Sequence, residues 1–455
     1  MQHITFGRRR PAAASELSCP CCYRPGVPLC DAFSPADNAL KVKGMRSLLA
    51  AHGLGGYLVP SGDAHSSEYV AREDQRREWL TGFTGSAGTA LITPTHALLW
   101  TDGRYFVQAE QQLAGTEWVL MRMNEPGVPD VEDWLAREGS KLPGPVGIDP
   151  TLVTISRASE WGAALTEPLA LIEPNLVDTA WGSDRPPLSE NPIKPHPLDL
   201  SGEPVSAKLR RVADALRQAQ VQSLILNALD QIAWLFNLRG SDIECNPVFF
   251  SYAVVSLQGS GADAGIDATL WLRQLDGVAE HLEREGCIVT TMEDGSAGAA
   301  VALGSDGEMP PDKDNVRITL RPYSHFNAAS AAAACAGGSG SESRVMLEGR
   351  TCTLACAAAI DESRRKLVLA SPIEKFKARK NGIERAGILS SGKKDAAAIV
   401  SYLAWLEDRL AQGAKVRGYS ARQIWANLSF PRRIECPPAF PLLHLLNASL
   451  CCPCP

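Results

Sequence analysis

The stretch MRSLLAAHGLGGYLVP, residues 45–60, contains apolar residues at helical spacing that end at Gly53, and then an apolar run, Tyr57–Val59, closed by Pro60. Helical spacing of apolar residues predicts a helix, and a short apolar run before a proline predicts a buried strand. The same order returns in LRRVADALRQAQVQSLIL, residues 209–226. The chain thus repeats a helix-then-strand opening, which is typical of α/β domains.

Short apolar runs continue to alternate with helical patterns after the first opening. The runs at 89–92, 97–101, 118–123 and 146–148 predict strands, and the patterns at 106–113 and 131–136 predict helices. This alternation indicates an α/β domain over residues 38–182.

Composition places the other boundaries. Asp184–Pro204 contains six prolines, which remove backbone donors and favour extended chain, so a linker is expected over 183–204. A second α/β domain is expected over 205–376, with a disordered insertion near 328–343, where an alanine, glycine and serine tract offers little to a packed core. Residues 1–37, rich in proline, alanine, serine and cysteine, are expected to form a disordered leader.

The rest of the chain contains one strong pattern, a long amphipathic helix predicted between Ile383 and Leu410. After Pro431 this periodicity stops, and the closing residues CCPCP have no helical or strand pattern.

Charge and composition exclude several classes of partner. The 45 basic and 51 acidic residues give a net charge of −6 and are interspersed, which argues against nucleic acid or an acidic membrane surface. No run approaches the roughly 20 apolar residues of a membrane helix. We expect a cytoplasmic protein, with an organellar transit peptide as the alternative because Arg8–Arg10 lie in an acid-free start. The 13 cysteines are odd in number, which favours reduced thiols.

Several longer motifs carry a family resemblance. In the first domain they are VPSGDAH at 59–65, TGFTGSAGTA at 81–90 and LWTDGRYF at 99–106; in the second they are ALDQIAWLFNLRGSD at 228–242 and NPVFFSYA at 246–253. These stretches resemble the aminopeptidase P (Xaa-Pro aminopeptidase) family in its long, cytosolic, three-domain form. The resemblance implies an α/β fold with two creatinase-like N-terminal domains, followed by the first helices of a truncated pita-bread catalytic domain at 377–430 and a non-family tail at 431–455.

The resemblance also implies an activity: removal of the N-terminal residue from peptides with proline at position two. The family holds two divalent metals, usually manganese, with two Asp, one His and two Glu. Past Asp408 this chain has one acid, Glu435, and one histidine, His444, and a two-metal hydrolase needs several carboxylates. We therefore expect no catalytic residue, metal or cofactor in this chain, and no activity of the chain alone.

An alternative function and a set of partners remain open. The alternative is a non-catalytic binding or regulatory protein that associates with a full-length aminopeptidase. The expected partners are proline-containing peptides in the complete enzyme, and either a second copy of the chain or a full-length paralogue.

Four polar residues are candidates for contact with a substrate or another subunit: His65, Arg104, Arg239 and Asp242. Loops on rigid α/β scaffolds commonly carry function, although structural ion pairs explain such residues equally well. Asp63, His65 and Glu68 could together bind one metal ion. We prefer the interpretation that they anchor a turn after a strand.

The glycines Gly82, Gly85 and Gly88 do not have the spacing of a dinucleotide or phosphate loop, and no Gly-Lys-Ser/Thr follows them. We expect them to form tight turns before a strand.

Overall fold

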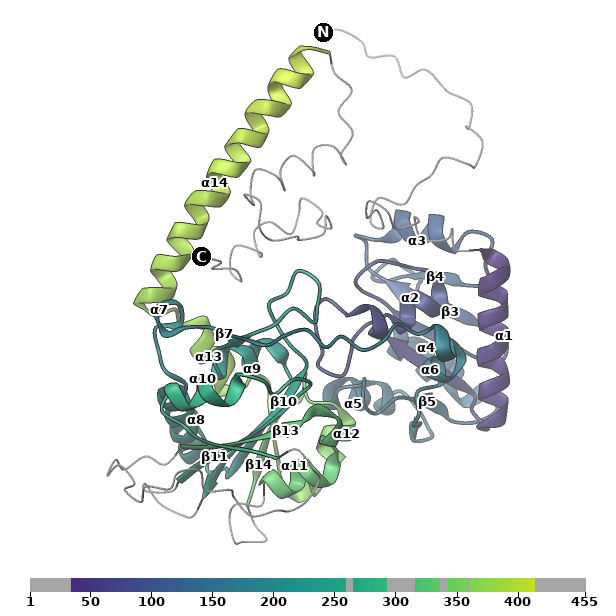
Figure 1. Cartoon of the computed structure of the whole chain (residues 1–455). Coiled ribbons are helices and arrows are strands. Elements are labelled where there is room, and N and C mark those ends of the chain that lie inside the picture. Colours follow the sequence, from purple (N-terminus) through teal and green to yellow (C-terminus); the bar gives the residue numbers. More distant parts are fainter. Residues whose placement is uncertain (1–33, 259–264, 293–315, 336–342, 359, 414–455) are drawn as a thin grey trace. The chain divides into compact units, whose positions relative to one another are not determined.

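The computed structural model describes residues 34–258, 265–292, 316–335, 343–358 and 360–413 (Figure 1). Residues 35–389 cluster as one unit and contain two lobes, each built on its own mixed sheet. The α/β fold expected from the alternation of strands and helices is therefore confirmed. Helix α1 begins at Pro35, so the last residues of the predicted leader are helical. Residues 1–33 and the predicted tail, 431–455, lie outside the described residues.

The first lobe contains a six-stranded sheet in the order β4-β3-β2-β1-β5-β6. Antiparallel pairing joins β1 to β2 and β2 to β3, whereas the pairs β3/β4, β1/β5 and β5/β6 are parallel. The strands are β1 (Gly56–Pro60), β2 (Thr89–Ile92), β3 (Ala97–Thr101), β4 (Val119–Arg122), β5 (Val146–Ile148) and β6 (Ala170–Leu171).

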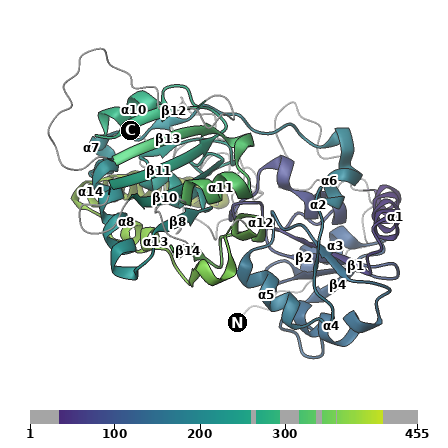
Figure 2. The ribbon, with the colours of Figure 1, turned by 90° about the horizontal axis from the view of Figure 1, so that it is seen from below.

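Helices cover both faces of this sheet (Figure 2). One face packs against α1 (Pro35–Ala51), α2 (Arg76–Thr81), α3 (Phe106–Leu113) and α6 (Leu176–Trp181). The other packs against α4 (Val131–Glu138) and α5 (Ile155–Ala163). Successive side chains of one strand point to opposite faces of the pleated sheet. In β2, Leu91 faces α4 and α5, and Ile92 faces α1.

The second lobe contains a seven-stranded sheet in the order β12-β13-β11-β10-β8-β14-β15. Its central strands are antiparallel and its outer ones parallel. The strands are β8 (Ser223–Leu226), β10 (Ser251–Gln258), β11 (Gly265–Leu272), β12 (Ile288–Thr291), β13 (Val316–Pro322), β14 (Val345–Glu348) and β15 (Arg365–Val368).

This sheet is also a middle layer. One face packs against α8 (Val205–Ala219), α9 (Leu229–Leu235), α10 (Val278–Arg284) and α13 (Pro372–Ala378), and the other against α11 (Ala328–Cys335) and α12 (Leu354–Ala358). The spacing that predicted α8 places Leu209, Val212 and Leu216 in the core, each 0% exposed. Burying each such side chain stabilises the lobe by about 1.5–3 kcal/mol. The predicted long helix is α14 (Gly382–Ala411).

One sequence prediction is wrong: the first half of the 328–343 tract is not a disordered loop but helix α11. Alanine has the highest helix propensity, and its small side chain lets the helix lie close to the sheet. Ala331 and Cys335 are buried there, and the hydroxyls of Ser256 and Ser223 donate to the last helical carbonyls at 2.8 and 3.3 Å. Residues 336–342 lie outside the described residues.

The proline-rich segment 183–204 contains two short elements, β7 (Lys194–Pro195) and α7 (Leu198–Ser201). Strand β7 pairs with β9 (Leu238–Arg239), and the His196 amide donates to the Asn237 carbonyl at 2.7 Å. The predicted linker is therefore attached to the second lobe along part of its length.

Of the three glycines Gly82, Gly85 and Gly88, the first and the last have positions that only glycine occupies without strain. Gly82 ends α2 in the left-handed conformation, at φ 78°, which L side chains adopt with strain. Gly88 lies where a Cβ atom would be 2.7 Å from the Trp100 carbonyl oxygen of β3. Close approach of two backbones therefore requires glycine here.

Candidate functional site at the junction of the lobes

The loop after β1 turns through a side-chain anchor. The Asp63 carboxylate accepts from the backbone amides of His65 at 3.0 Å and Ser67 at 2.9 Å, and Ser66 has φ 55°. The interpretation that Asp63 anchors a turn is therefore confirmed. This turn directs the side chain of His65 out of the first lobe and into the second.

His65 is 1% exposed, and both of its ring nitrogens are engaged. Nδ1 lies 2.9 Å from the carbonyl oxygen of Asn227, and Nε2 lies 2.7 Å from the Tyr323 hydroxyl. A carbonyl only accepts, so Nδ1 carries the proton and the tyrosine hydroxyl donates to Nε2. Burial lowers the pKa of His65, which favours this neutral form.

The surroundings of His65 come from the second lobe. The Tyr252 ring lies 4.5 Å from the imidazole between centroids, and the Phe250 ring lies 5.6 Å away. Asn227 follows β8, and Tyr323 follows β13. A residue of the first lobe is therefore held by two strand ends of the second.

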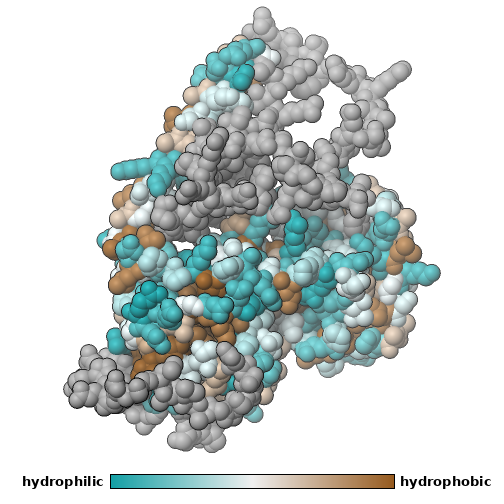
Figure 3. Space-filling model, in the orientation of Figure 1, coloured by the Kyte–Doolittle hydropathy of each residue, from teal (hydrophilic) through white to brown (hydrophobic). Residues whose placement is uncertain are grey.

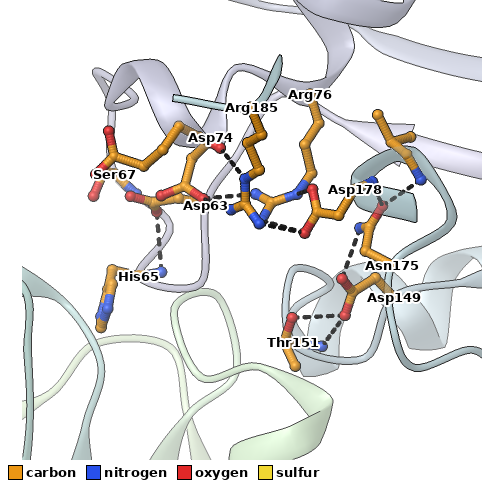
Figure 4. A network of polar contacts seen from close by, with 12 residues as sticks. Asp63, His65, Ser67, Asp74, Arg76, Asp149, Thr151, Asn175, Asp178 and Arg185 are labelled. Atoms are coloured by element: carbon orange, nitrogen blue, oxygen red, sulfur yellow. Dashed lines mark hydrogen bonds and ion pairs between the residues drawn. The ribbon is translucent and has the colours of Figure 1, made fainter. Parts of the chain in front are cut away.

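A charged network lies beside the Asp63 turn (Figure 4). Arg76 of α2 donates from Nε and Nη2 to the two carboxylate oxygens of Asp178, at 2.7 and 3.0 Å, and from Nη1 to Asp74 at 2.8 Å. Arg185 bonds the same two acids from the proline-rich segment, at 2.8 and 3.2 Å. Burial raises the pKa of Asp74, and Arg76 and Arg185 oppose that rise. The network joins the proline-rich segment to the first lobe.

Glu73 extends this network to the second lobe. It is 2% exposed, and its carboxylate accepts from the Ser189 amide at 2.7 Å and from Arg273 at 3.4 Å. Arg273 follows β11, also donates to the Ser189 carbonyl at 2.7 Å, and stacks on Phe250 with its guanidinium carbon 3.8 Å from the ring centroid. An arginine on an aromatic face combines cation–π attraction with its hydrogen bonds.

Backbone pairing adds a second connection between the lobes. Thr154, at the start of α5, forms an antiparallel bridge with Thr353. The Ile155 amide donates to the Cys352 carbonyl at 3.0 Å, and the Leu354 amide donates to the Val153 carbonyl at 3.0 Å. The segment before α12 therefore lies against the first lobe as a short strand would.

Asp242 belongs to the same junction as His65. It is 6% exposed and accepts from the backbone amides of Asn191 at 3.0 Å and Phe250 at 2.9 Å. Burial raises the pKa of Asp242, and these two amides oppose the rise. Phe250 is thus the residue that links the two candidates, since its amide bonds Asp242 and its ring contacts His65.

The other two candidates lie apart from this junction. Arg104 is exposed and bonds the Asp102 carboxylate from Nε and Nη2 at 2.9 and 2.8 Å, which lowers the pKa of Asp102. Arg239, in β9, donates to the carbonyls of Ala233 and Leu238 at 3.1 and 2.8 Å. Contact of either arginine with a substrate or subunit stays a prediction.

Most hydrogen bonds at the junction involve residues that the sequence did not indicate as candidates: Asn227, Arg185, Arg273, Tyr323 and Asp178. Arg185 lies in a stretch whose prolines indicated only a linker, and Tyr323 lies outside the motifs that carry the resemblance. Most of their partners are far away in sequence, such as Asp74 for Arg185 and His65 for Tyr323, so local periodicity gave no signal for them.

The described residues do not fit a metal centre. In the part of the chain that the structure describes, no group of three or more His, Cys, Asp or Glu side chains is arranged to hold a metal ion. Both ring nitrogens of His65 and one oxygen of Asp63 already have partners. Over the same residues, none of the helices combines the length and apolar character that a membrane span needs.

Comparison with known proteins places both lobes in one family. Residues 41–178 and residues 184–384 each match a family model described as the creatinase/prolidase N-terminal domain. Curated relatives include the Xaa-Pro aminopeptidase ApepP of Drosophila melanogaster, 36% identical over 80% of this chain and 53% of its own length. A probable Xaa-Pro aminopeptidase P of Talaromyces stipitatus is 36% identical over 80% of this chain and 50% of its own. The chain therefore spans about half the length of the curated relatives it matches.

A solved structure agrees with these relatives. The X-prolyl aminopeptidase of Caenorhabditis elegans, described as a cytosolic enzyme with a di-nuclear active site, superposes with a TM-score of 0.71 at 28% identity. The match covers 87% of this chain and 60% of that one.

Proposed function

The chain belongs to the creatinase/prolidase N-terminal domain family, and from this premise we propose that it forms the non-catalytic, amino-terminal portion of an Xaa-Pro aminopeptidase. The complete enzyme removes the first residue from peptides whose second residue is proline, and it acts in the cytoplasm. The observation that carries the proposal is the similarity to Xaa-Pro aminopeptidases, which extends over 80% of the chain at 36% identity.

The hydrolytic step is not assigned to the described residues. A two-metal hydrolase needs carboxylates that bridge its ions, and the described residues hold no such set. Under the proposal, two divalent metals, manganese by the family resemblance, belong to the complete enzyme.

The described residues instead hold two lobes together as one unit. His65 and Glu73 are buried and Arg273 is half-buried, and their partners lie across the junction or on the segment that joins the lobes. Hydrogen bonds of this kind depend on direction as well as distance, so they fix the orientation of one lobe relative to the other, which apolar packing alone would leave adjustable. A fixed pair of lobes is suited to shaping access to a catalytic domain.

A chimaera tests the proposal directly. Residues 35–389 would replace the corresponding part of Drosophila ApepP, and release of arginine from an Arg-Pro-Pro peptide would be followed with added manganese. We expect the chimaera to retain peptide cleavage and the present chain alone to release no arginine. A folded chimaera without activity would contradict the proposed role, and cleavage by the chain alone would contradict the assignment of the chemistry to the complete enzyme.

The alternative, a regulatory protein that associates with a full-length aminopeptidase, has one observation in its favour. Helix α14 exposes large apolar side chains, among them Leu389, Val400 and Leu403 at 68%, 65% and 53% exposure. Mixing the purified chain with complete ApepP and measuring both the mass of the assembly and the cleavage rate tests this function. An unchanged mass and rate would exclude association with this aminopeptidase.

A further inference from the structure

Two cysteines share a hydrogen bond in the interior of the second lobe. The Cys352 thiol hydrogen-bonds the Cys356 sulfur, and the two residues are 1% and 2% exposed. Cys356 lies in α12, and Cys352 lies two residues before this helix. Figure 3 shows hydrophilic and hydrophobic residues interspersed over the visible face of the lobes, whereas the two thiols belong to an apolar cluster with Leu347 and Ile360. The second lobe therefore holds a pair of buried thiols in contact.

The neighbours of the pair give its two sulfurs different characters. The hydrogen bond from Cys352 lowers the pKa of Cys356 against the opposing effect of burial. Thr353 and the side-chain amide of Asn227, 3.3 Å from the sulfur, donate to Cys356 as well. The same thiol–thiol bond, together with burial, raises the pKa of Cys352. Since the thiolate is the nucleophilic form of cysteine, Cys356 is the sulfur that can attack an oxidant, and Cys352 is the thiol beside it.

We propose that Cys352 and Cys356 are a modification site, at which a peroxide converts the two thiols into an intramolecular disulfide. The Cys356 thiolate attacks one peroxide oxygen, the O–O bond breaks, and Cys356 becomes a sulfenic acid. The hydroxide that leaves recovers the proton that Cys356 lost on ionisation. The Cys352 sulfur then attacks the sulfenic sulfur, the S–O bond breaks, and the second hydroxide takes the thiol proton of Cys352. Two thiols and one hydrogen peroxide thus give one disulfide and two waters, and two electrons pass from the sulfurs to the peroxide.

Burial by itself makes a thiol unreactive, as two other cysteines of the second lobe illustrate. Burial raises the pKa of Cys287 and of Cys335 to about 12, so both stay protonated at neutral pH. Cys356 is buried to nearly the same degree as Cys335, yet its hydrogen bonds lower its pKa. These hydrogen bonds therefore distinguish Cys356 from the other buried thiols.

The pair lies at the contact between the lobes, which gives peroxide a route and the disulfide an effect. The Cys352 carbonyl accepts from the Ile155 amide of the first lobe at 3.0 Å, and local opening of this backbone contact would uncover the segment that carries the two thiols. The Asn227 side chain that donates to Cys356 also donates to the Ala64 carbonyl of the first lobe at 3.2 Å. A disulfide offers Asn227 no thiolate, so oxidation weakens one hydrogen bond of a residue that joins the lobes.

Peptide mapping of the full chain tests the disulfide without a variant. The reduced chain is treated with hydrogen peroxide under native conditions, and the remaining free thiols are alkylated. Trypsin then releases residues 351–364, which contain Cys352 and Cys356 and no other cysteine. We expect this peptide to be unalkylated and two hydrogen atoms lighter than the dithiol, and we expect a reducing agent to restore its alkylation. The disulfide should form roughly tenfold faster than the thiol of Cys287 or Cys335 is lost, because those two thiols stay protonated.

Three serine variants separate the roles of the sulfurs. Cys356→Ser should leave Cys352 open to alkylation, because the attacking thiolate is gone. Cys352→Ser should stop the reaction at the sulfenic acid of Cys356, which dimedone labels, because no neighbouring thiol condenses with it. Cys335→Ser is the matched control, since Cys335 is a third buried thiol of the same apolar cluster, and this variant should form the disulfide as wild type does.

These measurements involve no aminopeptidase activity, so their outcome is independent of the proposed function. A 351–364 peptide that stays fully alkylated while the exposed Cys245 is oxidised would overturn the inference. A disulfide that forms only in urea would do the same, and so would a disulfide that joins Cys352 or Cys356 to a third cysteine.

Discussion

Replacing His65 with phenylalanine is expected to reduce the free energy of unfolding of residues 35–389 by about 2–6 kcal/mol. The variant keeps a ring beside Tyr252, whose centroid lies 4.5 Å from the imidazole, and removes both hydrogen bonds across the junction. The Asn227 carbonyl and the Tyr323 hydroxyl lose partners at 2.9 and 2.7 Å. Each buried polar group left without a partner costs about 1–3 kcal/mol, which gives the expected range.

Urea unfolding followed by circular dichroism measures this change. His52→Phe is the matched control, because His52 is an exposed histidine of the same lobe, and a surface substitution of this kind changes stability by no more than about 0.5 kcal/mol. Loss of less than about 0.5 kcal/mol in His65→Phe would refute the view that the histidine holds the lobes together.

A double-mutant cycle with Tyr323→Phe separates the hydrogen bond from other effects of the change. If the Tyr323 hydroxyl donates to His65 as the 2.7 Å distance indicates, the two substitutions should be coupled by about 0.5–3 kcal/mol. Strict additivity would show that the two side chains act independently.

Three further predictions concern other positions in the two lobes. Burial, reinforced by Arg239, lowers the pKa of His196 from 6.5 to about 4. Because the unfolded chain binds this proton at a higher pH than the folded chain does, the free energy of unfolding should fall as the pH drops from 6.5 to about 4. His196→Gln should lessen that fall, which urea unfolding midpoints measured at several pH values would show. Burial lowers the pKa of Lys208 from 10.5 to about 8. Between these pH values the folded chain has lost the proton and the unfolded chain still binds it, so the free energy of unfolding of wild type should rise with pH relative to that of Lys208→Met. Parallel plots of the free energy of unfolding against pH for the two proteins would contradict this. Gly88→Ala places a Cβ atom 2.7 Å from the Trp100 carbonyl oxygen and should lower the free energy of unfolding by about 1–3 kcal/mol, whereas Gly62→Ala, with nothing within 4 Å, should stay within about 0.5 kcal/mol.

Local patterns predicted the elements of both lobes well. The runs at 89–92, 97–101 and 146–148 are strands with those bounds, and 106–113 is a helix with those bounds. These elements are buried on one or both faces, so their side chains follow the period of the element. The tract at 328–335 was missed because its alanines have no alternation of apolar and polar residues, although α11 packs through Ala331.

The candidate site could be predicted only in part, because some of its contacts are local in sequence and others join distant residues. Asp63 bonds amides two and four residues away, so the sequence could indicate its turn. His65 meets Tyr323 across 258 residues, and Arg273 meets Glu73 across 200. Such pairs form only when the two folded lobes pack against each other, and the local periodicity of the sequence carries no information about that packing.

Three of the five motifs that carry the family resemblance lie at this junction. VPSGDAH supplies Asp63 and His65, and NPVFFSYA supplies the Phe250 and Tyr252 rings beside the imidazole. ALDQIAWLFNLRGSD begins one residue after Asn227, whose carbonyl accepts from His65. VPSGDAH is far in sequence from the other two motifs, which nearly adjoin each other, and the turn, the ring contacts and the hydrogen bonds at this junction all act on one histidine. The sequence stretches that resemble Xaa-Pro aminopeptidases therefore supply the turn, the rings and the neighbouring residues of the joint between the lobes.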